Sequence, residues 1–244
     1  DVSIVLSEIL SHKKVIPYKF SFIHSTNYLC IGSIIQWYSN SKSIIWGAGL
    51  LYYSININKP RKVLAVRGPL TRQCLLDNDI QCPEIYGDPA LLFPLFYQPK
   101  TSIRKYQLGI ICHYSELKKR EIPKPLSVSE KEILFINISQ YSKWTDFIDQ
   151  ICSCQCIISS SLHGIIIADA YKVPNIWTSF SNNKSKDNEF KFQDYFLSVN
   201  KTNERIALYD DLRYQQELIE YIKNKWVGPQ IDLNKLLSVC PFKV

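Results

Sequence analysis

The sequence predicts an α/β protein of two Rossmann-like domains, with parallel sheets that face a common cleft. Short runs of β-branched residues alternate with longer amphipathic stretches, which is typical of repeated β-α units around parallel sheets. A chain of 244 residues is long enough for two domains, and its hydrophobic content of 46% is enough to fill their cores. A stretch with two prolines, residues 94–104, separates the two series of units as a linker.

Turn and helix signals follow the expected strands of the first half. A Gly-Ser pair at 32–33 and a Gly-Ala-Gly run at 47–49 follow the second and third strands. Pro69, directly after Gly68, lies in the first turn of a helix that we expect to run to about Leu76. The expected elements before it are an apolar helix at 2–10 and strands at 14–18, 28–31, 43–46 and 63–66.

The second half repeats this alternation. We therefore expect one domain at residues 1–98 and a second at 105–225, followed by a C-terminal tail at 226–244. The polar segment 182–189 is expected to be a mobile loop near the cleft. The expected elements of this half are strands at 108–112, 133–136, 156–159 and 175–177 and helices at 144–151, 162–171 and 216–225.

The charge of the chain suits an anionic partner. With 29 basic and 22 acidic residues the net charge is +7, which favours an anionic ligand or an anionic membrane face. The densest basic stretch, residues 118–120, is flanked by Glu116 and Glu121 and has no interleaved aromatic residues, so we expect no nucleic-acid partner. No apolar run reaches the about 18 residues that a membrane span needs. We expect a cytoplasmic protein that can also attach peripherally to the inner face of the membrane.

The cysteines do not indicate a metal site. All eight are scattered, and we expect small buried side chains in a reducing compartment. Cys152, Cys154 and Cys156 recur with period two, whereas paired zinc ligands usually have two residues between them and partner ligands nearby. The sequence therefore predicts core or strand positions for this run.

The segment AVRGPLTRQCL (65–75) is the first candidate for chemistry. A strand places Arg67 at its carboxyl end, where open α/β sheets bind ligands, and Arg72 falls in the first turns of the next helix. A guanidinium group binds a carboxylate or a phosphate through two parallel hydrogen bonds. The alternative is structural: an arginine that braces the contact between domains or caps a neighbouring helix.

The segment YGDPALLFP (86–94) is the second candidate. A Gly-Asp-Pro turn after a strand can direct Asp88 into the cleft, as a base or as the partner of an arginine. The structural alternative is an Asx turn or a helix cap.

The segment IISSSLHGIIIADAYKVPNIW (157–177) is the most informative. A buried strand ends in three serines and a helix follows, with His163 and Gly164 in its first turn. The N–H groups and the positive end of a helix start attract an anion, and small residues there allow a ligand to approach closely. We therefore expect a binding site that contains Ser160, Ser161 and Leu162, with His163 as a functional residue.

Six segments together resemble the polysaccharide pyruvyltransferase family in order and spacing as well as in residues. The resemblance covers about residues 1–200, and six motifs in register make a chance match implausible. It implies a two-domain arrangement like that of the GT-B glycosyltransferases, phosphoenolpyruvate as donor, and no metal or other cofactor. The segments are WGAGL (46–50), VRGPLTR (66–72), YGDPALLFP (86–94), LGIICHY (108–114), SSSLHGIIIADAYKVP (159–174) and KFQDYF (191–196).

The sequence departs from this family in two places. Some members have Arg-Leu-His where this chain has Ser161-Leu162-His163, so an anion-binding arginine is absent or replaced here. Relatives also carry an Asn-x-Gly-Asp loop near their start, of which Asp1 is the expected last residue. Because the chain also contains no Met, we expect a preceding segment, and a first domain that lacks its first strand and its Gly-rich loop here.

The resemblance implies transfer of the pyruvyl group of phosphoenolpyruvate to a sugar of a surface polysaccharide or its lipid-linked precursor, as a ketal. The site must hold a carboxylate and a phosphate, supply one acid and accept protons from hydroxyls. We assign the donor anions to Arg67 and Lys191, and the phosphate to the helix start with Ser160 or Ser161. His163 is the leading general acid or base.

His113, at the end of the strand 108–112, is the second candidate for proton transfer or sugar binding, with a hydrogen-bonding role between domains as the alternative. His12 and His24 lack comparable context and are interpreted as structural. Aromatic residues at strand ends can stack on sugar rings, although such positions are more often part of a core. These candidates are Trp46, Trp177 and Tyr114.

Two other functions stay open. A glycosyltransferase that uses a nucleotide sugar would have the same fold, because fold does not determine function, and Asp169 is its candidate for the ribose hydroxyls. A non-catalytic glycan-binding or scaffold protein is the second alternative. The acceptor sugar, the ketal positions and the oligomeric state have no readable signal in the sequence.

Overall fold

The computed structural model describes residues 2–18, 25–100, 103–113, 116, 122, 124–180, 186–201 and 207–242, and the chain divides into two compact units. Unit 1 contains Asp1–Phe93, Ser185–Asn203 and Pro229–Val244, and unit 2 contains Pro94–Lys184 and Glu204–Gly228. This division differs from the linear one expected from the sequence. Helix α7 (Lys186–Ser198) and residues 229–244 of the expected C-terminal tail both return to unit 1, because their apolar and ionic partners lie there.

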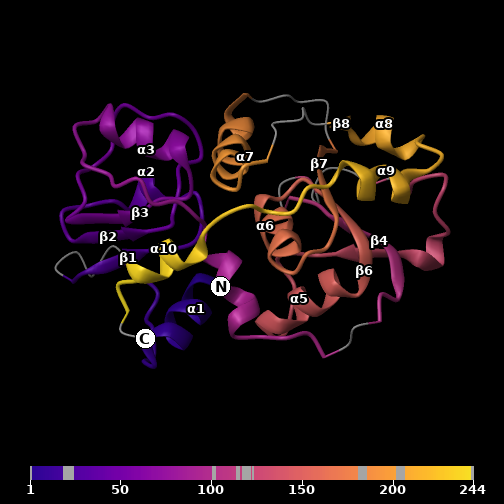
Figure 1. The fold of residues 1–244 in the computed structure, drawn as a ribbon, viewed down its shortest axis with the longest axis horizontal. Helices are drawn as coiled ribbons and strands as arrows, with labels where there is room; N and C mark the ends of the chain where they lie inside the picture. Colours follow the sequence, from indigo (N-terminus) through magenta and orange to yellow (C-terminus); the bar gives the residue numbers. More distant parts are fainter. Residues whose placement is uncertain are drawn as a thin grey trace. The chain divides into compact units, whose positions relative to one another are not determined.

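Unit 1 is built on a parallel sheet with strand order β1-β2-β3. Figure 1 shows α2 and α3 on one side of this sheet and α1 and α10 on the other. Gly68 is the N-cap residue of α3 and Pro69 opens the helix, as predicted. The elements are α1 (Val2–Ser11), β1 (Asn27–Leu29), α2 (Ile35–Tyr38), β2 (Ser43–Trp46), β3 (Lys62–Ala65), α3 (Pro69–Leu76), the 3-10 helix η2 (Pro89–Leu95) and α10 (Leu233–Ser238).

The core of unit 1 includes segments from both ends of the chain. Leu29, Ile45 and Val63 of the three strands pack in one cluster with Leu75 of α3. The indole of Trp46 is completely buried, and its Nε1 donates a hydrogen bond of 2.9 Å to the carbonyl of Leu236 in α10. The C-terminal helix is therefore part of this unit.

Unit 2 contains a parallel sheet of five strands in the order β5-β4-β6-β7-β8. From β4 the chain first moves to β5 on one side, and then passes to the other side of β4 to form β6. Ligands of open α/β sheets bind at the carboxyl ends of the strands where the strand order reverses in this way. The strands are β4 (Tyr106–Ile111), β5 (Ile133–Ile136), β6 (Cys154–Ser159), β7 (Asn175–Ser179) and β8 (Ala207–Leu208).

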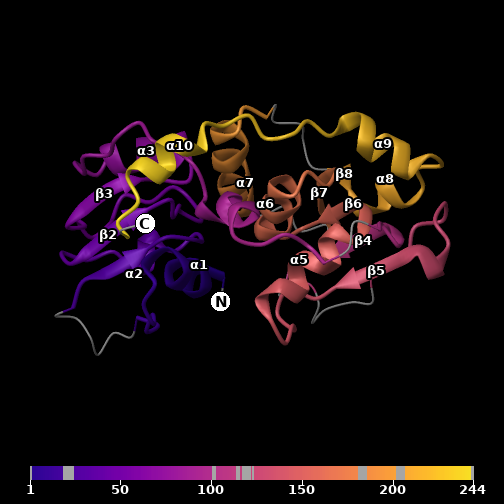
Figure 2. The ribbon, with the colours of Figure 1, turned by 60° about the horizontal axis from the view of Figure 1, so that its bottom comes forward.

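Helices cover both faces of this second sheet. On one face Leu108 and Ile158 of the strands pack with Leu212 of α8 (Tyr209–Arg213) and Ile222 of α9 (Leu218–Lys225). Figure 2 shows α8 and α9 on one side of the strands and α5 on the other. Among the described residues of unit 2, the other helices are the 3-10 helix η3 (Glu130–Glu132), α5 (Trp144–Cys152) and α6 (Leu162–Ala170). The prediction of α/β architecture with parallel sheets is confirmed.

Two local predictions are wrong. The expected strand at 14–18 is not a strand, because Pro17 has no N–H for a sheet hydrogen bond and the side chain of Ile16 is 73% exposed. Residues 182–185 of the expected polar loop lie outside the described residues, but residues 186–189 open α7. Phe192, Tyr195 and Phe196 give α7 a buried side at helical spacing, which the polar residues before them obscure in the sequence.

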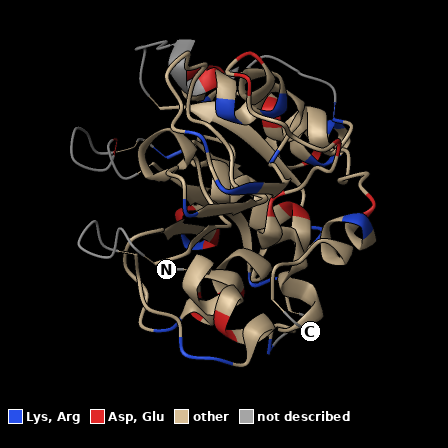
Figure 3. Ribbon diagram, turned by 90° about the vertical axis from the view of Figure 1, so that its left-hand side faces the viewer, with Lys and Arg blue, Asp and Glu red and all other residues tan. Residues whose placement is uncertain are grey.

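Charge and burial alone do not locate a site. Figure 3 shows Lys and Arg interspersed with Asp and Glu along the described ribbon, while the basic stretch 118–120 lies outside the described residues. Among the described residues, no helix has both the length and the apolar character to cross a membrane.

All eight cysteines are free and six are buried, which confirms the expected burial of those six. Burial raises the pKa of the Cys156 thiol to about 12.

Candidate active site

The carboxyl ends of β4 and β6 lie side by side at the point where the strand order of unit 2 reverses. Ile111 at the end of β4 is paired with Ser159 at the end of β6, and the N–H of Ser160 donates to the carbonyl of Ile111 at 3.0 Å. The chain continues from β4 into His113 and from β6 into Ser161 and α6. Two of the segments singled out in the sequence therefore meet at one edge of the sheet.

Hydrogen bonds join these two segments through Ser160. Its Oγ accepts the backbone N–H of His113 at 2.8 Å and donates to the carboxylate of Glu116. The N–H of Glu116 in turn donates to the carbonyl of His113 at 2.8 Å. The structure thus brings Ser160 and His113 together. Glu116 was missed, because in the sequence it stands only as the acidic flank of a basic stretch.

The start of α6 completes this edge. Ser161 is the N-cap residue, and Ser159 Oγ accepts its N–H at 3.0 Å and donates to its carbonyl at 2.9 Å. A Cβ on Gly164 would lie 2.4 Å from Ser159 Oγ, so only glycine lets α6 approach β6 this closely. The first N–H groups of a helix have no acceptor within the helix, and together with the helix dipole they attract an anion.

His163 follows Leu162 in the first turn of α6. Its side chain is half-buried, and its Nε2 is removed from solvent. The predicted residues Ser160, Ser161, Leu162, His163 and Gly164 therefore surround one helix start in unit 2. The binding of a small anion at this helix start and proton transfer by His163 stay predictions.

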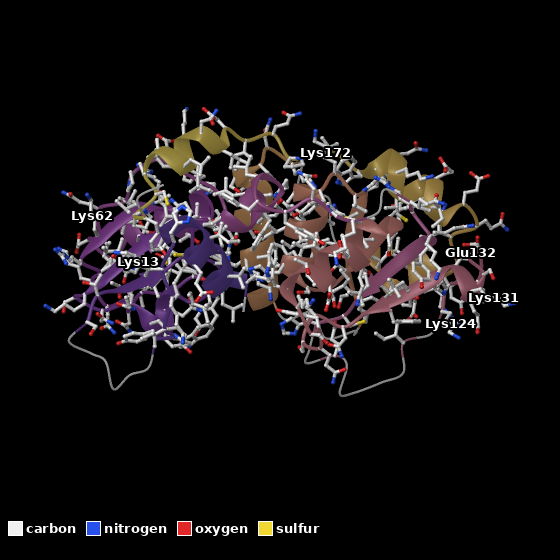
Figure 4. The ribbon with its side chains drawn as sticks, turned by 90° about the horizontal axis from the view of Figure 1, so that it is seen from below. Lys13, Lys62, Lys124, Lys131, Glu132 and Lys172 are labelled. Carbon is white, nitrogen blue, oxygen red and sulfur yellow. The ribbon has the colours of Figure 1, made fainter. Side chains whose placement is uncertain are left out.

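The charged residues of unit 2 that Figure 4 labels belong to segments that precede strands of its sheet. Lys124, Lys131 and Glu132 precede β5, and Lys172 precedes β7. Segments that precede parallel strands lie at the amino ends of those strands. Glu132 accepts a hydrogen bond from Gln107 Nε2 at 2.6 Å there. These charges lie at the sheet edge opposite to the start of α6.

Arg67 lies in unit 1 and is completely buried. Its Nε donates to Asp194 Oδ2 at 3.0 Å, and its Nη2 forms an ion pair with the same oxygen at 3.0 Å. Nη1 donates to Ser33 Oγ at 2.7 Å and Nη2 to the carbonyl of Leu50 at 2.6 Å. All three guanidinium nitrogens are therefore bonded within the protein, and the structure gives Arg67 a bracing role.

Asp194, within the KFQDYF motif of α7, is the other half of this brace. Its Oδ1 accepts the N–H of Thr71 at 2.8 Å, and its Oδ2 accepts the Thr71 hydroxyl at 2.7 Å. A Cβ on Gly68 would lie 1.9 Å from the Asp194 carbonyl oxygen, so α7 packs directly on the start of α3. Two of the family-like motifs thus meet in a structural contact, and the anion-binding role expected for Arg67 has no support in this geometry.

The other predicted residues of unit 1 are Arg72, Lys191 and Asp88. Arg72 Nε donates to the carbonyl of Cys82 at 3.2 Å, and the residue is partly exposed. Lys191 is buried in α7, with its ammonium group 5.4 Å from the centre of the Phe192 ring. Their anion-binding roles stay predictions.

Asp88 is completely buried, and its Oδ1 accepts the N–H of Ala90 at 3.0 Å at the start of η2. This is the turn and cap that the sequence left open as the structural alternative. Burial raises the pKa of the Asp88 carboxyl to about 7, although the charge of Arg67 acts in the opposite direction. The carboxyl therefore titrates near neutral pH, and its role as a base stays a prediction.

The described aromatic candidates, Trp46 and Trp177, are buried side chains. Trp46 is completely buried and Trp177 is only 9% exposed, so neither presents a ring face to a sugar. His12 follows the end of α1 with a φ of 52°. Tyr114 and His24 lie outside the described residues. In the described part of the chain, no group of three or more His, Cys, Asp or Glu residues is placed to hold a metal ion.

Asp169, the candidate for a nucleotide ribose, is completely buried in unit 2. Its Oδ1 accepts the side-chain amide of Asn175 at 2.7 Å and the indole N–H of Trp226 at 2.9 Å. These bonds fix the end of α6 to β7 and to the segment after α9. The position of Asp169 therefore favours a structural role.

Comparisons with known proteins agree with the motifs. A family model described as polysaccharide pyruvyl transferase matches residues 7–182, which include β6 and the start of α6. The chain belongs to this family. It is 33% identical over 179 residues to the uncharacterized protein L143 of Acanthamoeba polyphaga mimivirus. This alignment covers 72% of this chain and 61% of that relative. The chain thus spans less than two thirds of the relative's length. No solved structure matches the chain.

Replacing Asp194 with Ala should strongly destabilise unit 1. The change leaves the Arg67 guanidinium buried without its counter-charge, which costs about 3–5 kcal/mol in the free energy of unfolding. Urea unfolding followed by tryptophan fluorescence measures the loss. Asp211→Ala, at an exposed position of α8, is the matched control and should change the same quantity by less than about 0.5 kcal/mol. Equal effects of the two changes would contradict the brace.

Replacing Asp88 with Asn should remove a pH dependence of stability. The folded-state pKa of about 7 lies above the ordinary value of 3.8, so the associated stability is complete below that ordinary value and is lost as the pH rises through about 7. The free energy of unfolding of the wild type, relative to the variant, should therefore fall by about 4 kcal/mol from about pH 4 to about pH 8. Urea titrations of both proteins across this pH range measure the difference. If the free energies of unfolding of the wild type and the variant change in parallel with pH, the prediction is wrong.

Proposed function

We propose that this protein transfers the pyruvyl group of phosphoenolpyruvate to a sugar of a surface polysaccharide or its lipid-linked precursor, and forms a pyruvate ketal. One observation carries the proposal. The SSSLHG segment of this pyruvyl transferase family member lies at the switch point of unit 2, where a helix start, serine hydroxyls and His163 come together. This is the chemistry that a small phosphorylated donor needs.

The proposed reaction balances with the residues at this edge. The methylene carbon of the donor takes one proton, and a sugar hydroxyl attacks the neighbouring carbon and loses its own proton. The second hydroxyl then closes the ring as the bond to phosphate breaks, and its proton leaves with the phosphate. We assign the phosphate to the start of α6 with Ser161, and the proton transfers to His163 with His113 as the second group. General acid–base catalysis of this kind contributes about 10²–10⁴-fold to a rate.

The anion-binding roles of Arg72 and Lys191, both in unit 1, stay predictions. Arg67 is no longer assigned to an anion, because Asp194 already takes its charge. Asp88 is kept as a group that exchanges protons near neutral pH. The GT-B-like arrangement with a cleft, a cytoplasmic location and a peripheral membrane attachment stay predictions. The proposal needs no metal and no cofactor besides the co-substrate.

Ligand-dependent stabilisation separates this function from a nucleotide-sugar glycosyltransferase, whose ribose-binding candidate Asp169 is buried and bonded. Phosphoenolpyruvate at about a hundred times its dissociation constant should stabilise the protein by about 2.7 kcal/mol, seen as a raised melting temperature. Uridine and guanosine diphosphate sugars at the same concentration are expected to leave the melting temperature unchanged. Stabilisation by a nucleotide sugar alone would support the glycosyltransferase instead.

Replacing His163 with Ala should lower acceptor-dependent release of phosphate from phosphoenolpyruvate by about 10²–10⁴-fold, because the site loses its proton-transferring group. Phosphate is measured colorimetrically, and mass spectrometry of the acceptor detects the added pyruvate. His12→Ala is the control, since His12 lies at the end of α1 in unit 1. A folded His163 variant with near-wild-type turnover would remove this residue from the chemistry.

A further inference from the structure

Glu116 lies at the proposed donor site, although its negative charge does not suit the binding of an anion. Its carboxylate accepts the hydroxyl hydrogen of Ser160, and its backbone N–H is bonded to the carbonyl of His113. Ser160 directly precedes Ser161, the N-cap residue of α6. The Glu116 carboxylate is thus bonded to the residue that directly precedes the helix start proposed to bind the phosphate of the donor.

The hydroxyl of Ser160 cannot serve both anions at once. A serine hydroxyl has one hydrogen to donate, although its oxygen can accept as well. In the structure that hydrogen is directed to Glu116, while the oxygen accepts the N–H of His113 at 2.8 Å. The Ser160 side chain, which is 9% exposed, therefore has a single donor for which a carboxylate and an incoming phosphate would compete.

We propose that Glu116 is a positioning residue that competes with the donor phosphate for the hydroxyl of Ser160. With the site empty, the carboxylate holds the hydroxyl turned toward itself. When phosphate occupies the start of α6, the hydroxyl rotates to donate to the phosphate, and it continues to accept the N–H of His113. The competition weakens the binding of the free phosphate product and so favours its release. This inference rests on the proposed donor site.

Replacing Glu116 with Gln tests the competition directly. The amide removes the negative charge but can still accept the Ser160 hydrogen, so the local fold is retained. Inorganic phosphate, titrated into the full chain by isothermal calorimetry, should bind about fivefold more tightly to this variant than to the wild type, because a neutral amide oxygen holds the Ser160 hydrogen less strongly than a carboxylate does. In a Ser160→Ala background the same change should give a clearly smaller gain.

Glu132→Gln is the matched control, since it removes an equal charge at the opposite edge of the same sheet, where Glu132 is bonded to Gln107. It should leave the phosphate affinity unchanged. The inference is overturned if Glu116→Gln binds phosphate no more tightly than the wild type, or if Glu132→Gln gains as much affinity as Glu116→Gln. It is also overturned if Glu116→Gln gives the full gain in the Ser160→Ala background. Absence of phosphate binding in every variant would overturn it too. Acceptor-dependent pyruvyl transfer, measured separately, decides the proposed function, so the two can fail independently.

Discussion

The buried ion pair between Arg67 and Asp194 holds unit 1 together. Removing two opposite charges from water is costly, and the cost is offset only where every donor and acceptor finds a partner. Here Thr71, Ser33 and the carbonyl of Leu50 complete the bonding. Because Asp194 lies 127 positions after Arg67, the turn from β3 to α3 acquires its counter-charge only from a segment that follows most of unit 2.

Local patterns in the sequence were sufficient for much of the fold. The strands at 43–46 and 133–136 and the helix at 69–76 have the bounds that β-branched runs and a Gly-Pro start indicate. Long-range packing decided the rest. The helix α7 is stabilised by burial of Phe192 and Tyr195 and by the Asp194 ion pair, none of which the polar residues 182–189 reveal. The return of the last residues to unit 1 depends on Trp46 and Leu236, which are 190 positions apart.

The same distinction applies to the site. The passage from a buried strand through serines to a helix is a local signal, so the sequence alone placed Ser160, Ser161, His163 and Gly164 at the helix start where the structure has them. Their functional roles stay predictions. Glu116 was not found, because its contact with Ser160 joins positions 44 residues apart and depends on the adjacency of β4 and β6. Arg67 was found as a residue of interest, but a guanidinium that binds a ligand and one that braces a fold have the same sequence context until the partner carboxylate is known.

The discontinuous composition of unit 1 has a practical consequence. A fragment that stops at Phe93 would contain all three strands of its sheet yet lack two of the pieces that close it. The indole of Trp46 would have no α10 to cover it, and the Arg67 guanidinium would lack Asp194 of α7. Producing this half in isolation therefore calls for a spliced gene in which Ser185–Asn203 and Pro229–Val244 are joined to the first segment by designed linkers.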